Sequence, residues 1–174
     1  GIYDCFDNKG YITLGTSKDT SEFVCDNILY YWQNHLQWIY PDAQSMLVLC
    51  DGGGSNSCRH HIIKQDLYNL SKILDMNILV AHYPAYCSKW NPIEHKLFPH
   101  LHRAWEGAVF HNIQLVKELA LETSTKSGLS VEVRINHKTY ETGRKVSHDF
   151  KENLDKFIVF DELIPKWNYL FTKN

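Results

Sequence analysis

The sequence lacks the features of a membrane protein or a secreted protein. No apolar run is long enough to span a bilayer, and the first residues do not form a charged-then-apolar signal pattern. The five cysteines are odd in number and include no C-x-x-C pair, which argues against a zinc ribbon or a disulfide framework and favours a reducing compartment. No window is polar or repetitive enough to stay disordered. We therefore expect a globular cytoplasmic protein with no membrane partner.

Positive charge is also scarce. The chain has 18 lysine and arginine residues against 20 aspartate and glutamate residues, a net charge of −2 with histidine neutral. A self-contained DNA-binding module is usually basic, so the composition alone does not indicate a nucleic-acid partner. The 10 histidines add positive charge only below about pH 6.5.

Several motifs of known catalytic and cofactor sites are missing. The glycines at 52–54 are followed by Ser55-Asn-Ser57, which is not the Gly-Lys-Ser/Thr ending of a P-loop, and their spacing does not fit a dinucleotide fingerprint. There is no Gly-x-Ser-x-Gly nucleophile elbow. His95, His100 and His102 are not four residues apart, as the two histidines of a helical zinc site are. These absences argue against nucleotide binding, serine hydrolysis and zinc catalysis.

Patterns typical of strands and helices alternate along the chain, which predicts an α/β protein in three layers, with a central mixed sheet flanked by helices. The 174 residues are enough for one domain with a substantial core. Because the chain begins with Gly1 and not with Met, we expect a trimmed piece of a longer protein. The tail over 140–174 shows no clear pattern. The predicted elements are a hairpin over 2–15, helices over 20–39, 59–76, 91–105 and 111–125, and strands over 46–50, 77–81 and 131–135.

The first candidate site residue is Asp51. It ends the apolar run Met46–Cys50, which predicts a central strand covered on both faces, and it precedes three glycines. A metal ligand beside residues without side chains would let a bulky charged substrate approach closely. A turn aspartate that accepts backbone N–H bonds is the common alternative.

The second candidate is Glu94. It follows Asn91 and Pro92, which suit the N-cap and the first position of a helix, so a capping box explains it without any catalysis. Asp51 and Glu94, however, each lie just past the end of an apolar strand, and this placement predicts that both face one cleft. Two carboxylates in one cleft repel each other unless cations hold them, which favours Mg²⁺ or Mn²⁺.

Longer motifs around these acids resemble a known family. The element Asn91-Pro-Ile-Glu94 is similar to the third-acid motif of mariner-like and insertion-sequence DDE transposases. The segments Cys50–Asn56, His82–Pro84 and Ser88–Phe98 together resemble the bacterial Rhodopirellula-type DDE transposases. The resemblance runs from Gly1 to Asn168. It also takes in Leu14–Thr16, Asp19-Thr20, Trp105–Gly107 and Thr123–Leu129.

This resemblance implies a ribonuclease-H-like fold and a DNA strand-transfer reaction, in which three acids hold two divalent cations that activate water or a 3′-hydroxyl. Asp51 would be the second acid and Glu94 the third. The expected partners are transposon-end and target DNA at the bacterial nucleoid, and a second copy of the chain. Residues from about 130 to 174 would be a family-specific extension. The residues expected to contact DNA are Asn56, Lys89, Asn91, His95 and Lys96.

The first acid is the missing part of this prediction. In such folds it lies on a strand before the hairpin, and the resemblance places that strand upstream of Gly1. Asp4 is the only early strand acid that could replace it, but the matching Tyr-Asp belongs to the second strand. Two alternatives therefore stay open: a ribonuclease-H-like remnant or binding module that does not cleave, and a metal-dependent phosphatase or nuclease unrelated to transposition.

Overall fold

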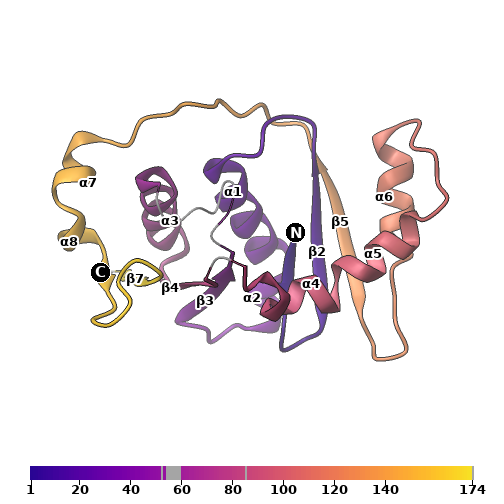
Figure 1. The fold of residues 1–174 in the computed structure, drawn as a ribbon, viewed down its shortest axis with the longest axis horizontal. Coiled ribbons are helices and arrows are strands. Elements are labelled where there is room, and N and C mark those ends of the chain that lie inside the picture. Colours follow the sequence, from indigo (N-terminus) through magenta and orange to yellow (C-terminus); the bar gives the residue numbers. More distant parts are fainter. Residues whose placement is uncertain (52, 54–59, 85, 174) are drawn as a thin grey trace. The chain divides into compact units, whose positions relative to one another are not determined.

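The computed structural model describes residues 1–51, 53, 60–84 and 86–173. It is an α/β structure with mixed parallel and antiparallel sheets, as the sequence predicts (Figure 1). The chain forms two compact units that are interleaved in sequence. The Asp51 unit contains Lys18–Cys87 and Tyr140–Asn174, and the Glu94 unit contains Gly1–Ser17 and Ser88–Thr139. The single domain predicted for residues 1–174 stays a prediction. No helix among the described residues is long and apolar enough to cross a membrane.

The Asp51 unit is built on a sheet with the strand order β3-β4-β7-β6. Strand β3 (Ser45–Cys50) runs parallel to β4 (Asn77–His82), as two apolar strands joined by a helix should. Strand β7 (Asn168–Phe171) pairs antiparallel with β4, and β6 (Val159–Phe160) pairs antiparallel with β7. Both of these strands come from the tail to which the sequence pattern assigns no element.

The helices of this unit follow the predicted periodicity closely. The helix expected over 20–39 consists of α1 (Ser21–Tyr31), a π-helical turn η1 (Trp32–Leu36) and α2 (Gln37–Ile39). The Thr20 hydroxyl caps α1 by accepting a bond from the Phe23 N–H at 3.2 Å. Helix α3 (His61–Leu74) ends at Asp75, whose left-handed φ of 51° stops it. The tail adds two short helices, α7 (His148–Glu152) and α8 (Leu154–Phe157).

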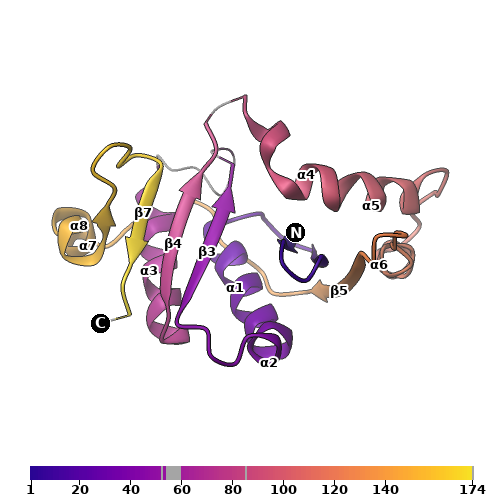
Figure 2. The same ribbon diagram turned by 90° about the horizontal axis from the view of Figure 1, so that it is seen from below.

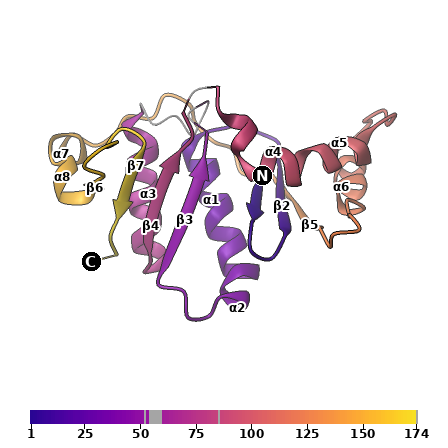
Figure 3. The same cartoon turned by 60° about the horizontal axis from the view of Figure 1, so that its bottom comes forward.

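Helices α1 and α3 cover one face of the sheet, where Ile78, Val80 and Tyr169 are buried (Figures 2 and 3). The opposite face is open: Leu47 is 57% exposed and Leu79 is 41% exposed. The prediction that the apolar run of β3 is covered on both faces is therefore wrong for the described part of the chain. Side chains alternate along a strand, and only every second residue of β3 faces the helices.

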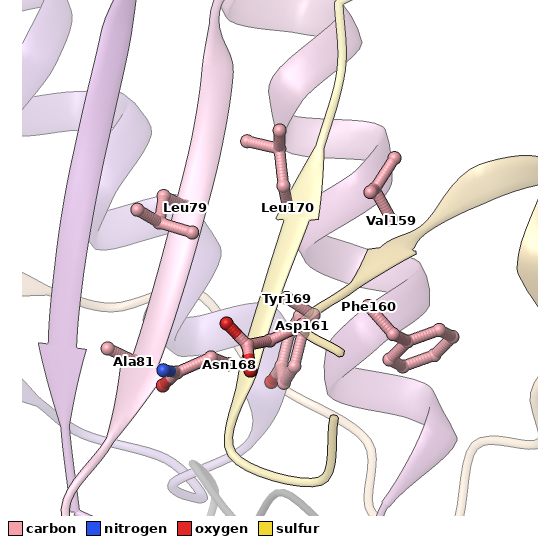
Figure 4. Close-up of a pocket in the computed structure, with 8 residues that line it drawn as sticks. All are labelled: Leu79, Ala81, Val159, Phe160, Asp161, Asn168, Tyr169 and Leu170. Atoms are coloured by element: carbon pink, nitrogen blue, oxygen red, sulfur yellow. The ribbon is translucent and has the colours of Figure 1, made fainter. Parts of the chain in front are cut away.

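A hollow of about 250 Å³ lies over this open face (Figure 4). Its polar lining includes Asp161, but the Asp161 carboxylate accepts backbone N–H bonds from Leu163 at 2.9 Å and Ile164 at 2.8 Å. The hollow contains none of the site residues predicted from the sequence. It is lined by Leu79, Ala81, Val159, Phe160, Asp161, Asn168, Tyr169 and Leu170.

The segment leading into α7 is tied to the two large helices by polar side chains. The Tyr140 hydroxyl donates to Asp26 of α1 at 2.8 Å. The Arg144 guanidinium contacts Asp66 of α3 and lies 3.5 Å from the Glu22 carboxylate of α1. Burial lowers the pKa of Arg144, but the Asp66 and Glu22 carboxylates raise it by more than burial lowers it. The pKa of Arg144 is therefore above its usual value, and the guanidinium stays charged.

Replacing Arg144 with alanine is therefore expected to lower the free energy of unfolding by roughly 1–2 kcal/mol, since Asp66 loses a charged hydrogen-bond partner. Urea denaturation followed by circular dichroism measures this change. Lys145→Ala is the matched control, because Lys145 is exposed and adjacent. Equal unfolding midpoints for the two variants would show that Arg144 does not hold the segment in place.

The Glu94 unit contains the hairpin and a strand from the second half of the chain. Strand β2 (Lys9–Gly15) pairs antiparallel with β1 (Ile2–Asp4) and parallel with β5 (Ser130–Asn136). The predicted hairpin over 2–15 is confirmed. Strand β1 ends at Asp4, and the left-handed turn residue is Asn8, with φ 52°.

The helix expected over 91–105 is broken into α4 (Pro92–Lys96) and α5 (Phe98–Trp105). Pro99 explains the break, because it has no N–H and its ring clashes with the carbonyl four residues earlier. A 3₁₀ turn, η3 (Ser88–Trp90), precedes α4, and α6 (Ile113–Leu121) follows α5. The buried core of this unit consists of Ile12, Leu97, Leu101, Ala120, Leu129, Val131 and Val133.

Candidate metal centre

Asp51 lies directly after β3, at the carboxyl end of the parallel pair β3–β4, where α/β sheets commonly build their sites. The residue is exposed. A Cβ atom at Gly53 would lie 3.7 Å from the Asp51 Oδ2 atom, which is ordinary van der Waals contact. The proposed role of the glycines beside Asp51 in letting a substrate approach stays a prediction. Asn56, predicted to contact DNA, lies outside the described residues.

The side chain of His82, a buried residue at the end of β4, contacts the main chain at Asp51. Its Nδ1 lies 3.1 Å from the Asp51 carbonyl oxygen and 3.3 Å from the Cys50 sulfur. Its Nε2 lies 2.7 Å from the Tyr169 hydroxyl. Because a carbonyl oxygen only accepts, Nδ1 carries the proton, and Nε2 accepts from Tyr169. The neutral ring thus has both nitrogens satisfied.

The pKa of His82 is lowered below its usual value. Burial is the main cause, and the nearby Lys64 adds to it, while the bond to the Asp51 carbonyl and the Asp51 charge act in the opposite direction. The folded protein therefore favours the neutral ring.

The free energy of unfolding is therefore expected to fall as the pH drops below about 6.5. In that range His82 binds a proton in the unfolded chain but stays neutral in the folded protein, so acid favours the unfolded state. Urea midpoints at pH 7.5 and pH 5.5 measure this loss. His82→Asn should reduce the difference between the two midpoints, whereas His137→Asn, at an exposed position, should keep it. An unchanged pH dependence in His82→Asn would contradict the prediction.

Glu94 lies in the first turn of α4 and is half-buried. The helix starts as predicted, with Asn91 at the N-cap in extended conformation and Pro92 at the first position. The Glu94 N–H donates to the Asn91 carbonyl at 3.1 Å. The Asn91 side chain makes no capping hydrogen bond, so the capping-box explanation of this pair is not what the structure shows. Asn91 is itself buried.

The basic residues predicted to contact DNA surround Glu94 on the same short segment. Lys89, His95 and Lys96 are all exposed. The His95 Nε2 contacts the Lys89 carbonyl oxygen, to which it donates, and this bond joins α4 to the turn before it. The Lys89 ammonium lies 5.2 Å from the centre of the Trp90 ring. Lys89 and the exposed Trp90 therefore precede the Glu94 helix, and Lys96 ends it.

Asp4 has a different role from the other two acids. Its Oδ1 accepts the Phe6 N–H at 3.0 Å and the Asp7 N–H at 3.2 Å, which is how a turn aspartate behaves. For Asp51 and Glu94, no such bond to the side-chain carboxylate is found within the part of the chain that the structure describes.

A divalent cation such as Mg²⁺ needs oxygen ligands, and the accessible carboxylate of Asp51 and the half-buried carboxylate of Glu94 are groups of that kind. Asp51 and Glu94 belong to different units. Among the described residues, no group of three or more histidine, cysteine, aspartate or glutamate side chains is placed to hold a metal. The donor type therefore fits the predicted metal, whereas a complete ligand set is not present in the described residues.

Three residues near Asp51 were not predicted from the sequence. His82 lies one residue beyond the strand predicted over 77–81, Tyr169 lies in the tail without a clear pattern, and Lys64 is a buried lysine whose ammonium lies 5.0 Å from the centre of the Tyr169 ring. The one sequence signal was the His82-Tyr-Pro segment. Nothing in the sequence links it to a tyrosine 87 residues later.

Comparison with protein families gives one match, to a family model described as "Rhodopirellula transposase DDE domain", over residues 1–173. Neither the curated proteins nor the solved structures contain a significant match.

Proposed function

Because the chain belongs to the family of Rhodopirellula transposase DDE domains, we propose that it is the catalytic region of a DNA transposase. The family membership supports a transposase-type function and DNA as the partner. More specifically, we propose that this region has a ribonuclease-H-like core that cleaves and transfers DNA strands. The observation that carries it is Asp51, an accessible carboxylate at the carboxyl end of two parallel strands, with glycine beside it.

In this proposal, Asp51 and Glu94 hold Mg²⁺ or Mn²⁺. When bound, the cations supply Lewis-acid activation of the attacking water or 3′-hydroxyl and stabilise the leaving oxygen. The chain itself orients these two carboxylates. Asp51 is exposed at the end of β3, and the Asn91-Pro92 start sets Glu94 in the first turn of α4.

The proposed DNA contacts are electrostatic. Lys89 and Lys96 are exposed cations on either side of Glu94, and lysine ammonium groups bind phosphate oxygens without reading sequence. His95 is exposed but holds the Lys89 carbonyl, so its proposed role is to shape the segment that presents the lysines. Asn91 is buried, and its proposed contribution is also to this shape.

The proposed first acid lies on a strand that precedes the hairpin. In the described residues, β3 is the edge strand of its sheet, beside β4, and the proposed strand would add to its other edge. An acid at the carboxyl end of a strand parallel to β3 would lie next to Asp51.

The test is cleavage of transposon-end DNA by this chain expressed with its complete upstream reading frame. We expect nicking that requires Mg²⁺ or Mn²⁺, stops with EDTA, and is lost in Glu94→Gln. Glu118→Gln, at an exposed position on α6, makes the same change of charge and should cleave normally. Nicking that survives Glu94→Gln would contradict the assignment of Glu94.

A second candidate function is a ribonuclease-H-like module that binds but does not cleave. The observation in its favour is that Asp4, the one early strand acid, is occupied by the hairpin turn. Calorimetric titration of residues 1–174 with Mn²⁺ distinguishes the two. We expect weak binding that strengthens when the upstream reading frame is added. Equally weak binding in both proteins would favour the non-cleaving module.

A further inference from the structure

The backbone ladder between β3 and β4 ends one residue before Asp51. The last paired residues are Cys50 and His82, and the Tyr83 N–H donates to the Cys50 carbonyl at 2.9 Å. The Asp51 carbonyl lies beyond the ladder, and its partner is the His82 ring. A side chain of β4 therefore continues the pairing of β3 where the backbone stops.

The His82 ring is itself fixed by β7. The Tyr169 hydroxyl donates to the His82 Nε2 atom at 2.7 Å. The centroids of the two rings lie 5.6 Å apart, and the ring planes make an angle of 38°. Tyr169 is 1% exposed, and its ring also packs edge-on against Phe171. Both rings are buried and hydrogen-bonded to each other, and this bond holds the Nδ1–H group toward the Asp51 carbonyl.

We propose that His82 and Tyr169 are positioning residues for Asp51: the buried pair fixes the main chain at the end of β3 and so sets the direction of the Asp51 carboxylate. This inference rests on the proposed role of Asp51 as a metal ligand. It adds two residues to the site that act through Asp51 and do not touch DNA or metal. Groups that orient a metal-binding carboxylate commonly change metal affinity or activity by roughly 10–100-fold when they are removed.

The two nitrogens of His82 allow a test that separates positioning from core packing. In His82→Asn the side-chain amide nitrogen can take the place of Nδ1, so the bond to the Asp51 carbonyl is kept. In His82→Gln the amide reaches instead to the place of Nε2, so the bond to Tyr169 is kept and the bond to Asp51 is lost. Both variants replace a buried ring with an amide, so a purely structural role would affect them alike.

The experiment measures DNA nicking by the protein with its upstream reading frame over a range of Mn²⁺ concentrations. We expect the Mn²⁺ concentration for half-maximal nicking to rise at least tenfold in His82→Gln and to stay within about threefold of the wild type in His82→Asn. Tyr169→Phe, which keeps the ring but removes the hydroxyl, should give an intermediate rise. Equal Mn²⁺ requirements for His82→Asn and His82→Gln, at matched urea stability, would overturn the proposal.

Mn²⁺ binding and nitrogen NMR keep this inference distinct from the proposed function. The wild-type His82 ring should show a protonated Nδ1 and an unprotonated Nε2 at neutral pH, and the opposite tautomer would overturn the geometry. If the wild type binds Mn²⁺ but does not nick DNA, the proposed function fails. The positioning role is then decided by whether His82→Gln weakens Mn²⁺ binding tenfold relative to His82→Asn. Equal Mn²⁺ affinities of these two variants would overturn it.

Discussion

Replacing Asp51 with asparagine is expected to abolish metal-dependent nicking, with a loss of about 10³-fold or more. Asparagine keeps the shape of the side chain but removes the charge that holds a divalent cation. The cation's contribution to the transition state is worth several kcal/mol, and each 1.36 kcal/mol is about a factor of ten in rate. Initial rates on labelled transposon-end DNA measure the loss.

Folding should not change in Asp51→Asn, because the carboxylate is exposed and makes no hydrogen bond to the described residues. Urea denaturation should therefore give a midpoint close to that of the wild type. Asp42→Asn is the matched control, since Asp42 is an exposed aspartate in the turn before β3, and it should nick DNA normally. Wild-type nicking in Asp51→Asn would remove Asp51 from the site.

The second large effect is expected at Leu97, the junction between α4 and α5. Leu97 is 0% exposed and belongs to the buried core of the Glu94 unit. Leu97→Ala should lower the free energy of unfolding by about 2–5 kcal/mol, the usual range for a leucine-to-alanine change in a core. Urea denaturation measures it. Leu121→Ala, on the half-exposed end of α6, should cost much less.

The same junction explains why position 10 is a glycine. A Cβ atom at Gly10 would lie 2.5 Å from the Leu97 Cδ1 atom, closer than real carbon atoms approach. Gly10→Ala should therefore destabilise the protein by about 1–3 kcal/mol, and much less in a Leu97→Ala background, where the clashing methyl groups are gone. A double-mutant cycle measures this coupling. Additive effects would contradict the close approach of β2 and the Leu97 side chain.

Local signals in the sequence were sufficient for the elements around the candidate site. Thr20 marks the start of α1 because its hydroxyl satisfies a free N–H there. Asn91 and Pro92 mark the start of α4 because proline loses nothing at a position whose N–H has no helical partner. Asp51 could be placed at a strand end because an apolar run followed by glycines has few other structures.

The sequence pattern could not show which strands pair. Strand β5 was predicted as a strand, but its parallel pairing with β2 joins residues 121 apart, and alternation of side chains carries no information about the partner. The strands β6 and β7 were missed because they are short and lie in an aromatic segment without clear alternation. Pro99 indicates the break at Leu97, whereas the helical spacing alone predicts one continuous helix.

The residues that contact Asp51 from the sheet were not predicted from the sequence. The assignment of Asp51 and Glu94 to a metal site stays a prediction. Asp4 accepts hydrogen bonds in the hairpin turn, a role that its position in the sequence also allows. His82 and Tyr169 could not be found from spacing, because a bond between two side chains on adjacent strands depends on the register of β4 with β7, where Ala81 lies opposite Asn168. Register is a property of the folded sheet.

The interleaving of the two units has a consequence for synthesis on the ribosome. Strand β2 is synthesised early, but its neighbour β5 is synthesised only after Leu129. In the same way, β4 is complete long before its neighbour β7. Until then, apolar strand edges stay unpaired, and such edges are sites of aggregation in incomplete chains. A premature stop before Asn168 would leave the sheet beneath Asp51 without β7, so cells should degrade or precipitate such shortened products rather than keep them as partly folded protein.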